Sequence, residues 1–160
     1  MRRFAALALV ASLALVVLPA LPAHAESHNE MAPSLYKRLG GYDALAAVVD
    51  DFIGRLATDP LIAKFFAGHS KDSLGRIRQL VVDQLCAATG GPCVYIGRDM
   101  KSSHQGMGIG EAEWQAAVQH LVATLDKFKV PEKEKGEVLA LVSTLKADIV
   151  EQKPAAPAKP

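Results

Sequence analysis

The chain has 160 residues, half of them hydrophobic, and its 18 basic and 17 acidic residues nearly cancel to a formal net charge of +1. This balance gives no electrostatic reason to expect nucleic acid or an anionic lipid surface as a partner. The length suits one domain with a substantial core and is too short for two.

The first 25 residues are predicted to be an export signal that is removed by cleavage. Arg2 and Arg3 form its positive end, an apolar run follows over residues 4–18, and Ala23-His24-Ala25 is an A-x-A cleavage site. A retained anchor is the alternative, but the run is shorter than the roughly 20 apolar residues that span a bilayer. We therefore expect an exported, periplasmic protein with no stable membrane anchor after cleavage.

The remaining chain is predicted to be one domain between two loose ends. Residues 26–32 read as an N-terminal linker, and residues 152–160 as a disordered Pro/Ala/Lys tail whose composition does not build a core. The domain therefore spans residues 33–151.

The first half of this domain has the helical spacing of apolar residues. A short helix at 34–39 ends before Gly40-Gly41, and a long helix is predicted over 42–58. Asp59-Pro60 begins a short helix that carries Phe65 and Phe66, because Asp caps helices and Pro suits their first position. Another long helix is predicted over 73–89, with its apolar face formed by Leu74, Ile77, Val81, Leu85 and Ala88.

The second half contributes two further helices. One apolar stripe starts at Trp114 and the other at Val138. Pro131 and Glu132 mark the start of the helix that carries the second stripe. The stripes are Trp114, Val118, Leu121, Leu125 and Phe128, then Val138, Leu141, Val142, Leu145 and Ile149. Strand-like alternation of useful length is missing, so the sequence predicts an all-α domain.

The chemistry-bearing segment lies between these halves, in the glycine-rich run 90–109. It places His104 after Gly90-Gly91-Pro92 and before Gly106-Met107-Gly108-Ile109. That arrangement would present one imidazole to a flat iron cofactor, but a lone histidine is not a site. On spacing alone, a haem-free exported helical binding module explains the chain as well.

Five ordered segments resemble the signature of the group I truncated haemoglobins. They are Ser34-Leu35-Tyr36-Lys37-Arg38-Leu39-Gly40-Gly41, Phe65-Phe66-Ala67-Gly68, Gly90-Gly91-Pro92, Met100-Lys101 and His104-Gln105-Gly106-Met107-Gly108-Ile109. The match runs in register over residues 34–151. The resemblance implies a truncated globin-like two-over-two helical sandwich around a haem, with a proximal segment that is mostly loop.

The resemblance also implies roles for individual residues. His104 aligns with the family's proximal histidine and would be the metal ligand, while Phe66 would pack against the haem. Met100 and Met107 would lie near the proximal face, with ordinary core filling as the alternative. Trp114 is taken as a further haem contact.

The distal side departs from the family pattern. A tyrosine commonly follows a phenylalanine in the second helix, but Phe52 is followed here by Ile53. Ile77 and Val81 align with the other usual distal positions, one of which often carries glutamine. The predicted distal wall is therefore apolar, and Gln79, Gln84 and His69 are the candidate replacement donors, with surface exposure as the alternative.

Cations and cysteines complete the predicted site. Arg78 and Lys101 are the expected partners of the haem propionates, with Arg76 as an alternative to Arg78. Cys86 and Cys93 either form a disulfide or remain free thiols. The absence of a Cys-x-x-Cys-His motif predicts a non-covalent haem b, and a zinc site lacks a fourth ligand.

The leading functional hypothesis is a haem protein that reversibly binds oxygen, nitric oxide or carbon monoxide at iron held by His104. The alternative from the enzyme class is haem-dependent nitric oxide detoxification or peroxidase-like turnover, which requires an unidentified reductant. The sequence favours a gas-binding protein over a dedicated enzyme because other catalytic motifs are missing.

Overall fold

The computed structural model describes residues 32–151. The predicted export signal, linker residues 26–31 and the tail 152–160 lie outside the described residues. Within residues 32–151 the secondary structure is entirely helical, which confirms the predicted all-α class. The elements are α1 (Leu35–Arg38), α2 (Gly41–Thr58), the 3₁₀ helix η1 (Ala63–Phe65), α3 (Lys71–Ala88), α4 (Met100–His104), α5 (Glu111–Lys127), α6 (Glu132–Ser143) and α7 (Lys146–Ile149).

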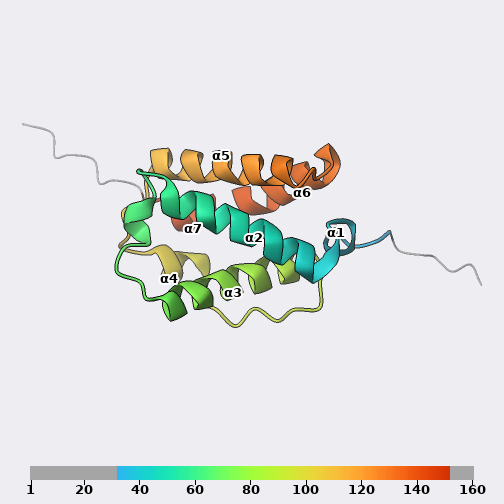
Figure 1. Ribbon diagram of the computed structural model, residues 1–160, viewed down its shortest axis with the longest axis horizontal. Helices are drawn as coiled ribbons and strands as arrows, with labels where there is room; N and C mark the ends of the chain where they lie inside the picture. The colour runs from blue at the N-terminus through green and yellow to red at the C-terminus, as the bar shows by residue number, and fades with distance from the viewer. Residues whose placement is uncertain (1–31, 152–160) are drawn as a thin grey trace, which may run out of the picture. The chain divides into compact units, whose positions relative to one another are not determined.

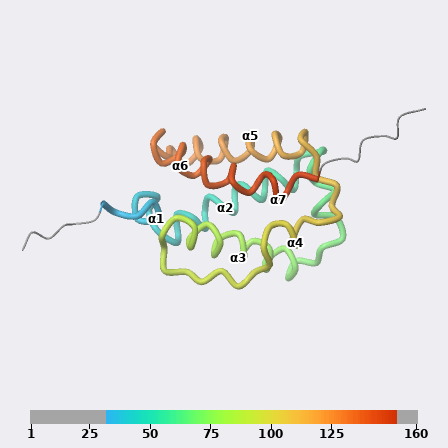
Figure 2. Tube along the Cα trace, turned by 180° about the vertical axis from the view of Figure 1, so that it is seen from behind, coloured from blue at the N-terminus to red at the C-terminus, as the bar shows by residue number. Residues whose placement is uncertain are grey.

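Helix α2 is the central element of the fold. It packs against α3 on one side and α5 on another, with α1 and η1 at its ends (Figure 1). Helix α6 packs against α5 and α1, whereas the short helix α4 packs against α7. Figure 2 shows the same arrangement from behind, with the segment between α3 and α4 running back along the length of α3.

The hydrophobic core lies between α1, α2, α5 and α6. Its central residues are Leu35, Val48, Leu121, Leu125 and Val138, each at most 9% exposed. Phe52 and several residues of α6 pack around this cluster. Because burying apolar area is the main stabilising contribution to folding, this cluster anchors α5 and α6 against α2.

Helix boundaries follow from local capping. Helix α3 begins after Ser70, whose hydroxyl accepts the N–H of Ser73 at 3.2 Å. Helix α4 begins after Asp99, whose carboxylate accepts the N–H of Ser102 at 2.8 Å. The proximal segment thus contains a capped helix of five residues, in addition to the loops that the resemblance implied.

The prediction of one continuous helix at the end of the domain is wrong. The apolar stripe from Val138 to Ile149 spans two helices, α6 and α7, which are separated at Thr144 and Leu145. The N–H groups of these two residues reach back three residues, to the carbonyls of Leu141 and Val142. The Thr144 hydroxyl also donates to Leu141, and such back-bonding bends helices.

Candidate functional site

His104 is the last residue of α4, and its ring is fixed by the backbone. Its Nδ1 lies 2.8 Å from the carbonyl oxygen of Met100, one turn earlier in the helix. A carbonyl only accepts hydrogen bonds, so Nδ1 carries a proton, and in the neutral imidazole the lone pair therefore lies on Nε2. Within residues 32–151, Nε2 has no hydrogen-bond partner, and the side chain is half-buried. The imidazole is therefore prepared to bind a metal ion through Nε2.

The helix that carries His104 is held at its N-terminus by Asp99. Both carboxylate oxygens of Asp99 bind Ser102, one accepting its N–H and the other its hydroxyl, each at 2.8 Å. These bonds, with the backbone N–H of Ser102 as the largest cause, hold the pKa of Asp99 below its usual range. The carboxylate thus stays charged and keeps the helix start in place near neutral pH.

Helix α3 has two stripes of apolar residues, of which one is fully buried by protein and the other only partly. Val82 and Cys86 are fully buried, and Arg78 and Gln79 bind α2 through their side chains, so this face lies against α2. The apolar stripe predicted from the sequence is displaced from this face by one residue, which is a rotation of about 100° around the helix axis. Its large residues Leu74, Ile77, Val81 and Leu85 are only half-buried, and Ala88 is exposed.

The apolar residues assigned to the cofactor share this partial burial. They come from α2, the end of η1, α3, α4 and the following loop, and none of them is fully covered by the described chain. The half-buried residues are Ile53, Phe66, Ile77, Val81, Met100 and Met107. Trp114 differs, because it is 7% exposed and packs as a core residue at the start of α5.

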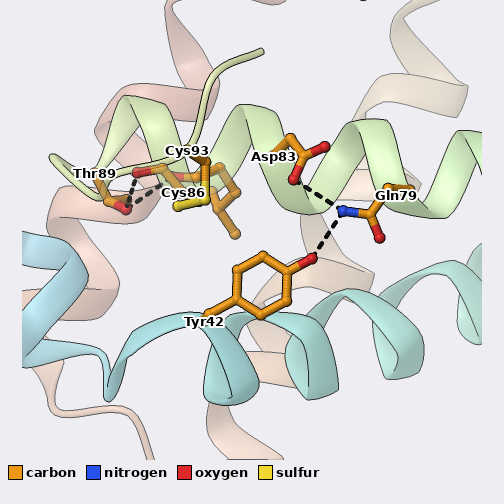
Figure 3. Close-up of a disulfide and its surroundings, with 7 residues drawn as sticks. Tyr42, Gln79, Asp83, Cys86, Thr89 and Cys93 are labelled. Atoms are coloured by element: carbon orange, nitrogen blue, oxygen red, sulfur yellow. Dashed lines mark hydrogen bonds between the residues drawn. A yellow bond between two sulfur atoms is a disulfide. The ribbon is translucent and has the colours of Figure 1, made fainter. Parts of the chain in front are cut away.

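The candidate replacement donors are engaged elsewhere or make no described contact. Gln79 donates from Nε2 to the Tyr42 hydroxyl at 2.8 Å and to Asp83 at 2.9 Å, so it bridges α2 and α3 (Figure 3). His69 is exposed and binds the hydroxyl of Ser73 at 2.7 Å. Gln84 is half-buried and makes no side-chain hydrogen bond within residues 32–151.

The expected propionate partners behave differently from one another. The guanidinium of Arg78 forms a bidentate ion pair with Asp50 of α2 at 2.7 and 2.9 Å, so it has a carboxylate partner within the described chain. This pairing lowers the pKa of the Asp50 carboxyl and raises that of Arg78. Lys101 is exposed and forms no ion pair within the described chain, and the same holds for Arg76. Of these cations, Lys101 lies nearest to His104 in the chain, on the same short helix.

A disulfide joins the end of α3 to the segment that leads to α4. Cys86 and Cys93 are bonded, with their Cα atoms 5.8 Å apart (Figure 3). The turn between them folds tightly, because the N–H of Gly91 donates to the carbonyl of Cys86 at 2.8 Å. Both sulfurs are thereby consumed, so neither is available as a zinc ligand or for a thioether bond to haem.

The loop that follows His104 is held by a residue that sequence reasoning missed. Glu151, the second residue after α7, accepts the N–H of Gly106 with its carboxylate and donates its own N–H to Ile109 at 2.8 Å. No spacing motif links residues so far apart in the chain. The contact becomes visible only through the packing of α7 against α4.

These features fit a haem. Protoporphyrin is a flat, largely apolar group that requires an axial nitrogen, and the chain provides the Nε2 of His104 with half-buried apolar side chains from several elements. Among residues 32–151, the structure shows no group of three His, Cys, Asp or Glu side chains that could hold a metal ion by themselves. In the same part of the chain, no helix is long and apolar enough to cross a membrane.

Comparison with known proteins agrees with this reading. Residues 34–151 match the family described as Bacterial-like globin. The Group 1 truncated hemoglobin GlbN of Mycolicibacterium paratuberculosis is 34% identical over 116 residues, covering 72% of this chain and 83% of that protein. GlbN of a Nostoc species is 31% identical, with 73% and 97% covered.

Solved structures show the same relationship. The Fe(III) form of truncated hemoglobin from Tetrahymena pyriformis superposes with a TM-score of 0.68 at 26% identity, covering 75% of this chain and all of that one. The 2/2 hemoglobin from Synechococcus, which has covalently attached heme, gives 0.69 at 27% identity with the same coverage. The haem-free module is thereby set aside: the chain belongs to the bacterial-like globin family, as a haem-binding group I truncated haemoglobin.

Proposed function

We propose that the protein reversibly binds a diatomic gas, oxygen, nitric oxide or carbon monoxide, at a haem whose proximal ligand is His104. The observation that carries this proposal is the His104 ring, whose Nδ1 is bound to the Met100 carbonyl while Nε2 has no partner in the described chain. When bound, the haem supplies an iron centre that takes up such a gas. We expect the chain to orient the imidazole and to line the haem with the half-buried apolar side chains, which would exclude water.

The distal wall sets the expected preference among gases. Ile53, Ile77 and Val81 offer no hydrogen-bond donor, and Gln79 is bound to Tyr42 and Asp83. A gas that becomes partly charged on binding, as oxygen does, gains no hydrogen bond from these residues. Losing such a bond of about 1.5–3 kcal/mol weakens retention roughly ten- to a hundredfold, so we expect weak oxygen retention.

An Ile53→Tyr variant tests the apolar wall, with Ile53→Phe as the control of similar bulk without a hydroxyl. We expect rapid oxygen release from the native protein and from the phenylalanine variant, measured by stopped-flow mixing. The tyrosine variant should release oxygen about tenfold more slowly or more, because it restores a donor. Slow release from the native protein, unchanged by tyrosine, would contradict the proposal.

We expect the haem to be bound without a covalent link. Cys86 and Cys93 are joined to one another, which supports this proposal by removing the thiols that form thioether bonds. The Synechococcus structure shows that the family also includes covalently attached heme. Extraction of the haem into acidified butanone distinguishes the two forms, since a covalent haem stays with the protein.

Export with cleavage before Glu26 is part of the same proposal. The disulfide supports it, because such bonds persist mainly in oxidising compartments outside the cytosol. N-terminal sequencing of the mature protein checks the cleavage position. Haem-dependent turnover, such as nitric oxide detoxification, requires an electron donor, and no observation on the described chain favours it over gas binding.

A further inference from the structure

The loop between α4 and α5 connects His104 directly to the rest of the domain, yet it has little structure of its own. It runs over residues 105–110 and includes two glycines in the left-handed region, Gly106 at φ 83° and Gly108 at φ 67°. Its local hydrogen bonds are short-range: Gln105 binds Lys101 at 2.9 Å, and Met107 binds His104 at 3.1 Å. Such a segment does not fix its own path, because its glycines have wide conformational freedom.

Glu151 provides the hydrogen bonds that reach this loop from a distant part of the described chain. Its carboxylate accepts the N–H of Gly106, two residues after His104, and its own N–H donates to the carbonyl of Ile109 at 2.8 Å. One residue therefore holds both halves of the loop. Ile109 is buried at 8% exposure, which fixes the far end, whereas Gly106 is exposed and depends on the carboxylate.

These two hydrogen bonds of Glu151, called the Glu151 clamp below, are connected to His104 through the contacts around them. Helix α4 has only five residues and packs against α7, which ends two residues before Glu151. Asp99 holds the start of α4, and the Glu151 carboxylate holds the chain just after its end. A surface depression of about 440 Å³ is lined by Lys101, Gly106, Asp148 and Glu151 among others, so solvent reaches the clamp.

We infer that Glu151 is a positioning residue for the proximal histidine, setting the orientation of the His104 ring by fixing Gly106 through its carboxylate. The inference rests on the proposed role of His104. The side chain is suited to this task because its oxygen accepts the Gly106 N–H, and a glutamine amide oxygen at 151 accepts it as well. Without it, the remaining hydrogen bonds of Gln105 and Met107 are local ones, and we expect the imidazole to sample a wider range of tilts although α4 still packs against α7.

The variants Glu151→Ala, Glu151→Gln and Asp148→Ala separate the hydrogen bond from the charge. Alanine at 151 removes the acceptor, whereas glutamine removes the charge and keeps an oxygen that accepts the Gly106 N–H. Asp148 lies in α7 beside the same depression and makes no side-chain hydrogen bond within residues 32–151. Its alanine variant therefore removes a comparable charge and leaves the loop contact intact.

The decisive readout is the iron–histidine stretching band in the resonance Raman spectrum of the ferrous, gas-free holoprotein. We expect this band to broaden and shift in Glu151→Ala, and to remain close to native in Glu151→Gln and Asp148→Ala. Haem loss to an acceptor globin should accelerate roughly three- to tenfold in the alanine variant at 151. Amide exchange of Gly106 in the carbon monoxide form should accelerate in that variant alone.

The outcomes are separable. A native band and a native exchange rate in Glu151→Ala would overturn the inference while leaving His104 as the ligand. Equal changes in Glu151→Ala, Glu151→Gln and Asp148→Ala would also overturn it, since charge alone would then explain the effect. A native protein that shows no iron–histidine band would instead refute the proposed function.

Discussion

At the scale of single residues, the structure shows which contact orients the His104 imidazole and why residue 91 is a glycine. The Met100 carbonyl selects the tautomer of His104, because it leaves Nδ1 only the role of donor. The sequence predicted a proximal segment that is mostly loop, with Met100 near His104, whereas the structure places both residues on one short helix. The identity of the carbonyl partner required the helix α4, which was not predicted as a regular element.

Gly91 occupies a position where a side chain does not fit. A Cβ there would lie 2.6 Å from Cδ2 of Tyr36, 2.7 Å from Sγ of Cys86 and 2.8 Å from the Cys86 carbonyl oxygen. The last contact is with backbone and is not relieved by rotating a side chain. Gly91→Ala should therefore destabilise the fold by about 1–3 kcal/mol.

Gly54 provides the matched control for this substitution. It lies inside α2, and nothing is within 4 Å of a Cβ built there. Gly54→Ala should stabilise the protein by about 0.5–1 kcal/mol, since alanine suits a helix interior better. Urea unfolding measures both changes. Equal shifts in the two variants would contradict the close packing at Gly91.

At the scale of elements, the periodic pattern predicted which segments are helices but not which face of α3 meets protein. Val82 and Cys86 face α2, whereas the stripe of Ile77 and Val81 is only half-covered. Both stripes are apolar, so composition does not separate a face that packs on a helix from one that packs on a cofactor. The ion pair of Arg78 with Asp50 was not predicted either, because the spacing of apolar residues does not specify which charged side chains meet across two helices.

The disulfide is the covalent tie between α3 and the segment that leads to α4. Its cysteines are 7 positions apart, and a loop of this length is expected to contribute about 2–3 kcal/mol through the entropy of the unfolded chain. Cys93→Ala should therefore lower the free energy of unfolding by that amount. Cys93 is the better site for the change, because Cys86 is completely buried.

Reduction of the Cys86–Cys93 disulfide in the native protein offers an independent measure of its contribution to stability. Denaturant unfolding of the reduced native protein should match that of the Cys93→Ala variant within error. A reduced protein as stable as the oxidised one would show that the disulfide does not contribute to the fold.

At the scale of the whole molecule, ion pairs join helices that are far apart in the chain. Arg38 of α1 binds Glu134 and Glu137 of α6, and Asp51 of α2 binds Lys127 and Thr124 of α5. These contacts were not predictable, because helical periodicity does not specify which exposed faces meet. The overall class and the family were predictable, since apolar spacing and ordered motifs are local features of the sequence.

Asp51, which also pairs with Arg55 within α2, predicts how stability depends on pH. The pKa of Asp51 lies below its usual range, chiefly because of its bond with Arg55 and then Lys127. A lowered folded pKa means that the contribution is present above the unfolded pKa, near 4, and is lost as pH falls through the folded value. The free energy of unfolding should therefore fall in acid.

Asp51→Asn tests this dependence, with Asp148→Asn as control. The Asp51 variant should be less stable near neutral pH and should lose less stability between about pH 5 and pH 2, because its partner interactions no longer titrate. The Asp148 variant should follow the native curve. Parallel curves for the native protein and Asp51→Asn would contradict the assigned ion pairs.

The central claim is that His104 holds the haem iron through Nε2, and replacement by glycine tests it most directly. Ferrous and ferric absorption spectra of His104→Gly should lose the native pattern, and added imidazole should restore it by replacing the missing ring. His69→Gly, at an exposed histidine, should leave the spectra native. A His104→Gly protein whose spectra equal those of the native protein without imidazole would contradict the account.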